Sequence, residues 1–239
     1  MDQPKRSRIW ELDALRGVCI LCVILVHLLF DLSYFLGVSI HANPALLFIQ
    51  QYGGVVFVLL SGLCATLGRH SFRRGLAVFG CGMLVTLVTW AMVPLGMADE
   101  SVVVRFGVLH LLGLCMMLWP LLRKLPTWAM AVLGLVIVVL GYWFAGIEVG
   151  PGWLFPLGLK NASFQSGDYW PLFPQLGWFL LGAVLGRTVY REKKTLLPRF
   201  PSEAAPVRFL RWCGRQSLWI YLVHQPLLYG LTALLRILS

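Results

Sequence analysis

Charged side chains are scarce in this sequence, and acidic ones especially so. Asp, Glu, Lys and Arg make up 13% of the 239 residues, with 10 acidic against 20 basic residues. A soluble domain carries about a quarter of its residues as charges, so this chain has too few to cover a surface that faces water. Hydrophobic residues reach 59% and run in long spans from end to end, which predicts a single integral-membrane domain over residues 1–239.

The cysteine spacing of a disulfide framework or a zinc site is also missing. The six cysteines lie in or beside apolar spans, and the CxxC of Cys19 and Cys22 falls inside a helical stretch, where its spacing only places both on one face. We interpret the cysteines as packing thiols and expect no metal. The sequence shows no internal repeat, a feature that many carriers have.

The apolar spans predict an all-α polytopic membrane helix bundle of about seven transmembrane helices, since a helix needs about 20 residues to cross the hydrocarbon core. The predicted helices cover residues 12–36, 44–67, 74–94, 104–122, 127–146, 172–189 and 215–237.

The basic residues support one orientation of this bundle. All but three of the 20 Lys and Arg residues fall in segments that the seven-helix topology places on one side, the exceptions being Arg105, Lys160 and Arg236. Because cytoplasmic loops are enriched in Lys and Arg, this predicts a cytoplasmic N-terminus and an outer C-terminus. The net charge of +10 therefore indicates membrane lipid as a partner and no nucleic acid.

Two long loops and one helix motif stand out in this topology. The outer loop, 147–171, is rich in Pro, Gly and aromatics and fits either a segment that folds back into the membrane or an interfacial aromatic belt. The inner loop, 190–214, is basic, and we expect it to lie along the anionic leaflet or to meet a polyanionic substrate. Gly182 and Gly186 form a GxxxG that indicates close helix packing.

Ionisable side chains within the first predicted helix suggest chemistry. His27 follows an uninterrupted apolar run, and Asp31 lies four residues later, on the same helix face. Such groups are costly in a membrane and mark functional sites by default. This spacing would let Asp31 accept a hydrogen bond from one imidazole nitrogen and leave the other to take a proton from a nucleophile. A pair that only holds helices together is the alternative.

Further polar residues flank or share this region. Arg16 lies roughly 16 Å before His27 along a helix, near the cytoplasmic surface, where it could bind phosphate or simply snorkel. His110 and His224 lie in other predicted helices, and each is either a packing contact or the wall of a site. Three histidines on different helices make a shared polar cavity the more credible interpretation. His70, in an inner basic loop, is interpreted as a solvated residue.

Four stretches resemble one membrane family. The segment WELDALRGVCILCVILVHLLFDLSYF resembles the start of a bacterial family of unknown function that is related to the lysosomal enzyme heparan-alpha-glucosaminide N-acetyltransferase. The stretches FGVLHLLG (106–113), DYWPLFPQLGWFLLGAVLGR (168–187) and GRQSLWIYLVHQPLLYGL (214–231) resemble it in the same order. Gln175 departs from the pattern, because related bacterial chains tend to have tryptophan there.

The resemblance implies transfer of an acetyl group from cytoplasmic acetyl-CoA to an acceptor on the far side of a bacterial cytoplasmic (inner) membrane. It makes His41 the loose counterpart of the lysosomal enzyme's proposed catalytic histidine. A more distant resemblance, to the integral-membrane acyltransferases that modify surface polysaccharides, also implies a histidine in the first helix. We therefore favour His27 as the base and leave His41 open, as the alternative base or as an acceptor contact. The glucosaminide acceptor is not carried over, because the outer loops do not match.

These observations together predict an acyl-CoA-dependent membrane acyltransferase acting on a hydroxyl or amine of a sugar or glycan, with His27 as base and Asp31 orienting it. The alternatives are a proton-coupled transporter that uses the same pair and a haem-binding electron-transfer protein. The oligomeric state stays open, a homodimer being one of the states considered. The remaining predicted site residues are Arg16, His110, His224 and Gln225 for the acyl donor, and His41, Arg105, Asp168 and Tyr169 for the acceptor side.

Overall fold

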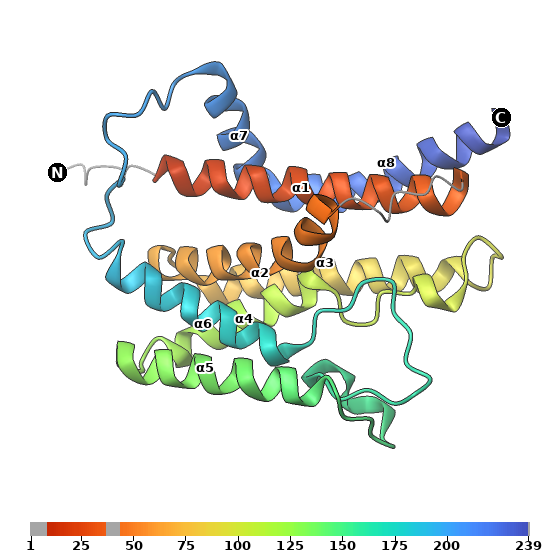
Figure 1. Ribbon diagram of the computed structural model, residues 1–239, viewed down its shortest axis with the longest axis horizontal. Helices are drawn as coiled ribbons and strands as arrows, with labels where there is room; N and C mark the ends of the chain where they lie inside the picture. The colour runs from red at the N-terminus through yellow and green to blue at the C-terminus, as the bar shows by residue number, and fades with distance from the viewer. Residues whose placement is uncertain (1–8, 37–43, 239) are drawn as a thin grey trace. The chain divides into compact units, whose positions relative to one another are not determined.

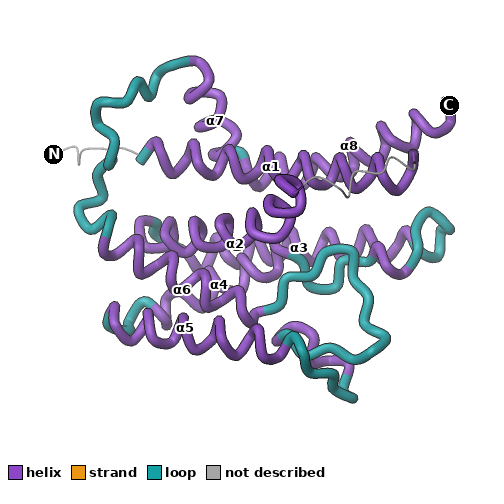
Figure 2. The backbone as a smooth tube through the Cα atoms, viewed as in Figure 1, coloured by secondary structure: helices purple, strands orange, loops and turns teal. Residues whose placement is uncertain are grey.

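A computed structural model describes residues 9–36 and 44–238, and its regular structure is helical (Figures 1 and 2). Within those two ranges the only β-type pairings are two isolated bridges, Phe106 with Tyr169 and Glu148 with Lys160. The prediction of an all-α fold is confirmed. The α-helices are α1 (Trp10–Leu36), α2 (Pro44–Leu67), α3 (Ser71–Met92), α4 (Val108–Leu122), α5 (Thr127–Phe144), α6 (Leu172–Thr188), α7 (Ala205–Arg215) and α8 (Ser217–Leu238), with 3-10 turns η1 (Glu100–Val102) and η2 (Gly152–Leu157).

In the part of the chain that the structure describes, four helices are long and apolar enough to cross a membrane: Trp10–Ser33, Leu46–Leu67, Ser71–Met92 and Thr127–Phe144. Helix α4 is apolar but shorter, at 15 residues. The structure is thus that of a helical membrane bundle, and the crossings of α4, α6 and α8, like the orientation, stay predictions.

Two boundaries differ from the predicted ones for physical reasons. Helix α4 begins at Val108 and not at residue 104, because the backbone before it is extended and its Phe106 carbonyl accepts a hydrogen bond from the Trp170 amide at 2.9 Å. The inner loop predicted over 190–214 contains helix α7. Its prolines suggested a loop, yet Pro206 stands in the first turn, where proline is compatible with a helix.

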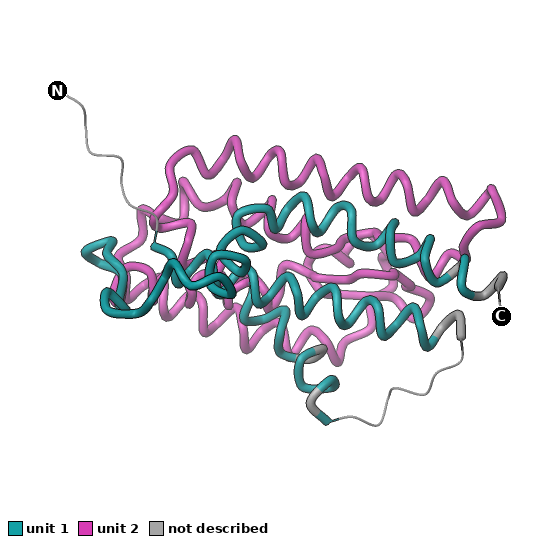
Figure 3. Tube along the Cα trace, turned by 90° about the horizontal axis from the view of Figure 1, so that it is seen from above, with its two compact units in different colours: residues 1–57, 190–239 teal, residues 58–189 magenta. Residues whose placement is uncertain are grey.

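The chain divides into two compact units (Figure 3). Unit 1 comprises residues 1–57 and 190–239, and in it α1 packs against both α7 and α8. Unit 2 comprises residues 58–189, and in it α3 packs on α4, α5 on α6, and α4 on α6. Unit 1 therefore draws its helices from both ends of the chain. The single-domain prediction is not tested by this division and stays a prediction.

Glycines bring the backbones of α2 and α6 together inside unit 2. A Cβ added at Gly182 would overlap the carbonyl of Leu59, and one at Gly62 would overlap the carbonyl of Phe179. Gly186 likewise faces the α2 residues Leu63 and Thr66. The close packing predicted from the GxxxG is confirmed.

A single arginine fastens the ends of two helices in the same unit. Arg187, in the last turn of α6, donates hydrogen bonds from Nη1 to the Leu125 carbonyl at 2.7 Å and from Nη2 to the Arg123 carbonyl. Its guanidinium also lies over the ring of Trp119, 5.8 Å from the centroid. Carbonyls just beyond the end of α4, which have no intrahelical partner, are thereby satisfied by α6.

We predict that Gly182→Ala destabilises the protein while Gly80→Ala does not. The methyl group at 182 has to displace the Leu59 backbone, at a cost of about 1–3 kcal/mol, whereas a Cβ at Gly80 meets nothing within 4 Å. Both glycines lie within helices, so the gain in helix propensity on going from Gly to Ala is the same for the two variants. Thermal unfolding in detergent, followed by size-exclusion chromatography, should show a lower Tm for Gly182→Ala only. Equal Tm values for the two variants would contradict the contact.

Candidate functional site

The polar residues of unit 1 gather on two neighbouring helices. Helix α1 carries His27 and Asp31, and α8, which packs on α1, carries His224 and Gln225. The two imidazole rings meet edge to face, with centroids 4.9 Å apart and an interplanar angle of 75°. The Tyr221 ring lies 5.2 Å from that of His224. The structure therefore brings together four of the predicted site residues.

Both histidines have their ring orientation fixed by their own helix. Nδ1 of His27 donates to the Val23 carbonyl at 2.9 Å, and Nδ1 of His224 donates to the Tyr221 carbonyl at 2.6 Å. Because a carbonyl can only accept, the proton of each neutral ring is on Nδ1 and the lone pair on Nε2. Each ring thus has Nε2 as an acceptor, the form that a general base requires.

Asp31 contacts a different partner from the one that the sequence predicts. Its two carboxylate oxygens each accept a hydrogen bond from Nε2 of Gln225, at 3.3 Å. The predicted bond from His27 to Asp31 is replaced by the bond to Val23. Helical side chains lean toward the N-terminus, so the imidazole reaches the carbonyl one turn before it and not the carboxylate one turn after it. Gln225, in turn, holds the carboxylate from α8.

Two acceptors in this cluster have no hydrogen-bond partner among the residues that the structure describes. They are Nε2 of His224 and Oε1 of Gln225, adjacent on α8. His224 is only 7% exposed and Asp31 only 3%. Buried polar atoms are nearly always hydrogen-bonded, so the pair fits a bound molecule that offers N–H or O–H groups. The buried carboxylate of Asp31 suits a developing positive charge beside it.

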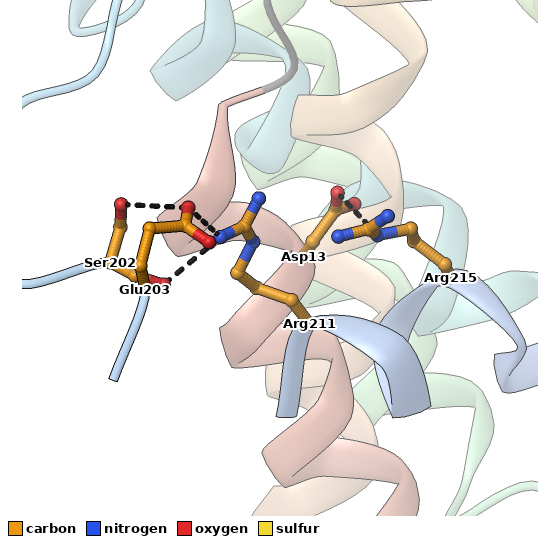
Figure 4. Close-up of polar contacts among 5 residues, drawn as sticks. All are labelled: Asp13, Ser202, Glu203, Arg211 and Arg215. Atoms are coloured by element: carbon orange, nitrogen blue, oxygen red, sulfur yellow. Dashed lines mark hydrogen bonds and ion pairs between the residues drawn. The ribbon is translucent and has the colours of Figure 1, made fainter. Parts of the chain in front are cut away.

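Two ion pairs lie near the N-terminal end of α1, one between α1 and α7 and one between α7 and the loop before it (Figure 4). Arg215 approaches Asp13 at 3.8 Å, and Arg211 pairs with Glu203 at 2.7 Å. The hydrogen bond and charge of Arg211 hold the pKa of the Glu203 carboxyl below its ordinary value. Arg16, one turn after Asp13, is partly buried at this same end of α1.

In unit 2, His110 has both ring nitrogens occupied. The Gly107 amide donates to Nδ1 at 3.2 Å, so Nε2 bears the proton and donates to Thr86 Oγ1 at 3.2 Å. The Thr86 hydroxyl in turn donates a hydrogen bond to the Val104 carbonyl at 2.6 Å. His110 is 2% exposed and caps the N-terminus of α4. This is the packing interpretation of His110, with the opposite tautomer to that of His27; nothing in this geometry tests the other interpretation, a role in binding the acyl donor, and a His110 variant distinguishes the two.

Other predicted residues of unit 2 fasten the loop between α5 and α6. Asp168 Oδ2 accepts a hydrogen bond from the amide of Val108, the first residue of α4, at 3.0 Å. Arg105 Nε donates to the Gln165 carbonyl at 3.0 Å. The Tyr169 hydroxyl donates to the Phe155 carbonyl at 2.6 Å, and burial raises the pKa of Tyr169 to about 12. The loop is therefore a folded structure with its own hydrogen bonds.

One predicted site residue lies outside the described residues, and the sequence did not reveal several other residues of the site region. His41 falls outside the described residues, and a cavity shared by all three histidines would join the two units, so both stay predictions. Thr86 and Ser166 carry no motif, and only the fold reveals that they link loop and helix. Gln175 Oε1 and Trp178 Nε1, one turn apart on α6, are buried without a hydrogen-bond partner in the described part of the chain. The sequence marked Gln175 only as a departure from related chains.

The apolar helices and the buried histidine, carboxylate and amide cluster define an integral-membrane protein with a polar site among its helices. The family model described as "Heparan-alpha-glucosaminide N-acetyltransferase, catalytic" matches residues 8–226, and the chain belongs to this family. The relationship inferred from the four stretches is confirmed, and it makes this a member of a transmembrane acetyltransferase family. Searches of curated proteins and of solved structures gave no match.

We predict that His110→Ala lowers stability without touching donor binding. The substitution leaves the Gly107 amide and the Thr86 hydroxyl without their partner, at a cost of about 1–3 kcal/mol. The Tm in detergent should fall, and the Kd for acetyl-CoA of the folded fraction should stay unchanged. His70→Asn is the control, because His70 is exposed at φ 59°, a conformation that asparagine tolerates. If the Tm is unchanged and acetyl-CoA binding is lost, His110 belongs to the donor site and the capping interpretation is wrong.

Proposed function

We propose that this protein is a transmembrane acyltransferase that moves an acetyl group from cytoplasmic acetyl-CoA to a hydroxyl or amine, on a sugar or glycan, at the outer side of the membrane. Membership of the family supports the reaction class. The observation that supports this location of the site is the pair of edge-to-face imidazoles, in which both Nε2 atoms are acceptors. A base with a fixed tautomer is what transfer to an O–H or N–H group needs.

In this proposal His27 Nε2 takes the proton of the acceptor as its oxygen or nitrogen attacks the thioester carbonyl. The carbon–sulfur bond then breaks, the proton passes from the imidazolium to the sulfur, and CoA leaves as the thiol. Asp31 acts through its charge, since an adjacent carboxylate stabilises the imidazolium, and Gln225 holds that carboxylate in place. His224 Nε2 would accept a hydrogen bond from a second O–H or N–H of the bound acceptor.

The donor would approach from the cytoplasmic end of α1. Arg16 is proposed to meet the phosphates of CoA, because guanidinium–phosphate contacts are strong and directional. On the other side, Arg105, Asp168 and Tyr169 are proposed to act by shaping the loop that the acceptor meets, and His41 stays the alternative base. The inner membrane of a bacterium is the proposed location, with membrane lipid around the helices.

We predict that His27→Ala lowers acetyl transfer by a factor of roughly 10² to 10⁴, the usual contribution of a general base. The assay follows radiolabelled acetyl groups from acetyl-CoA onto a panel of sugars and glycans that offer a hydroxyl or an amine, in proteoliposomes. His70→Asn should transfer at the unaltered rate. Transfer that survives in His27→Ala and disappears in His41→Asn would assign the base to His41, and substrate flux without any acyl-CoA would favour a carrier.

We predict that Arg16→Gln weakens acetyl-CoA binding to the purified protein by about tenfold to a hundredfold, because a hydrogen bond to a charged group contributes roughly 1.5–3 kcal/mol. Isothermal calorimetry in detergent measures the Kd. Arg73→Gln, at an exposed position of α3, should bind as tightly as the unaltered protein. If no accessible acyl-CoA thioester binds the unaltered protein, the donor part of the proposal is wrong.

A further inference from the structure

Helix α7 lies at the membrane-entry end of α1. The Leu210 carbonyl of α7 occupies the space that a Cβ at Gly17 would need, and a Cβ at Gly214 would overlap the Asp13 carbonyl. The apolar span of α1 begins at Trp10, so these contacts fall within its first turns. Figure 1 shows α7 steeply inclined to α1. Because α1 is long and apolar enough to cross a membrane, a helix fixed across its first turns would fit the depth of the lipid headgroups.

The α7 surface divides into three faces at 100° per residue. One face, with Leu210, Cys213 and Gly214, packs toward α1. A second face exposes Phe209 and Trp212, at 54% and 55%, with their rings stacked 6.4 Å apart. The third is basic, with Arg208, Arg211 and Arg215. The exposed aromatic face is out of place in water but is typical of an interfacial helix.

The charges of this region are only partly used within the protein. Arg211 and Arg215 pair with Glu203 and Asp13. Exposed Arg208 has no ion pair within 4 Å in the described part of the chain and acts on Glu203 only at longer range, where its charge helps to lower the pKa of that carboxyl. The loop before α7 adds the exposed basic residues Arg191, Lys193 and Arg199, whereas Lys194 pairs with Glu192 at 3.1 Å.

Hydrogen bonds and an aromatic contact hold that loop against α1. The Glu11 carboxylate accepts hydrogen bonds from the Thr195 hydroxyl and the Leu196 amide, both at 2.8 Å, and Phe200 stacks on Trp10 at 5.2 Å. This basic surface is held in place beside the exposed aromatic face of α7. Together they complement an anionic bilayer, which is negative at its headgroups and apolar beneath them.

We propose that α7 is an in-plane interfacial helix that binds anionic phospholipid, with Phe209 and Trp212 among the upper acyl chains and Arg208 on the lipid phosphate. This goes beyond acyl transfer and does not depend on it. Tryptophan and arginine both favour the headgroup region, the former for its amphipathic ring and the latter for its charge. A partner protein on this face is the competing occupant that the test has to exclude.

The test uses the full chain with a photo-reactive benzoylphenylalanine in place of Trp212, reconstituted in vesicles of equal parts phosphatidylcholine and phosphatidylglycerol. Mass spectrometry of the irradiated protein identifies the adducts. The same label at Lys194, which is 77% exposed and paired with Glu192, is the control in a polar loop. We expect lipid adducts from position 212 and few from position 194, with a ratio of phosphatidylglycerol to phosphatidylcholine among the adducts that is about fivefold higher than the equal ratio of the bilayer.

Adding Arg208→Gln to the labelled protein should bring the enrichment close to the bilayer ratio while the total lipid adduct at 212 persists. Arg73→Gln, the matched exposed arginine of unit 2, should keep the fivefold value. Three outcomes overturn the proposal: no lipid adduct at 212, equal yields at 212 and 194, or an adduct to protein in place of lipid. Enrichment that is unchanged in Arg208→Gln overturns the assignment of the phosphate to Arg208.

Discussion

A polar side chain within a bilayer has to find its hydrogen-bond partner inside the protein, because the hydrocarbon core offers none. Much of what is specific in this structure follows from that constraint. His27 and His224 satisfy Nδ1 on carbonyls of their own helices, which leaves Nε2 as an acceptor. His110 satisfies both nitrogens on the segments around α4. The same residue type thus presents an acceptor nitrogen in one place and caps a helix in another, and the partner of its second nitrogen decides which.

Helix association in a membrane gains little from hydrophobic burial, so close packing has to supply the attraction. Glycines meet this need in each unit separately. Gly17 and Gly214 bring α1 and α7 to backbone contact, and Gly62 and Gly182 do so for α2 and α6. Helices that approach this closely have little freedom to slide.

The sequence predicted the helices well, because apolar spans of membrane length have few other interpretations. It also identified the residues that cluster on α1 and α8. It was wrong about the partner of His27, since a four-residue spacing says that two side chains share a face but not which of them the ring turns toward. The sequence did not predict helix α7, because the prolines in and before it are typical of a loop. The caps made by Asp168 and Thr86 depend on contacts between distant segments, which leave no local pattern.

Unit 1 unites the first helix of the chain with the last, and this imposes an order on assembly. As the chain enters the membrane, α1 arrives with Asp31 long before α8 brings Gln225. During that interval the carboxylate lacks the amide that it has in the finished structure. The polar cluster is complete only once α8 has packed on α1. A chain that lacks α8 therefore has a carboxylate without its amide partner.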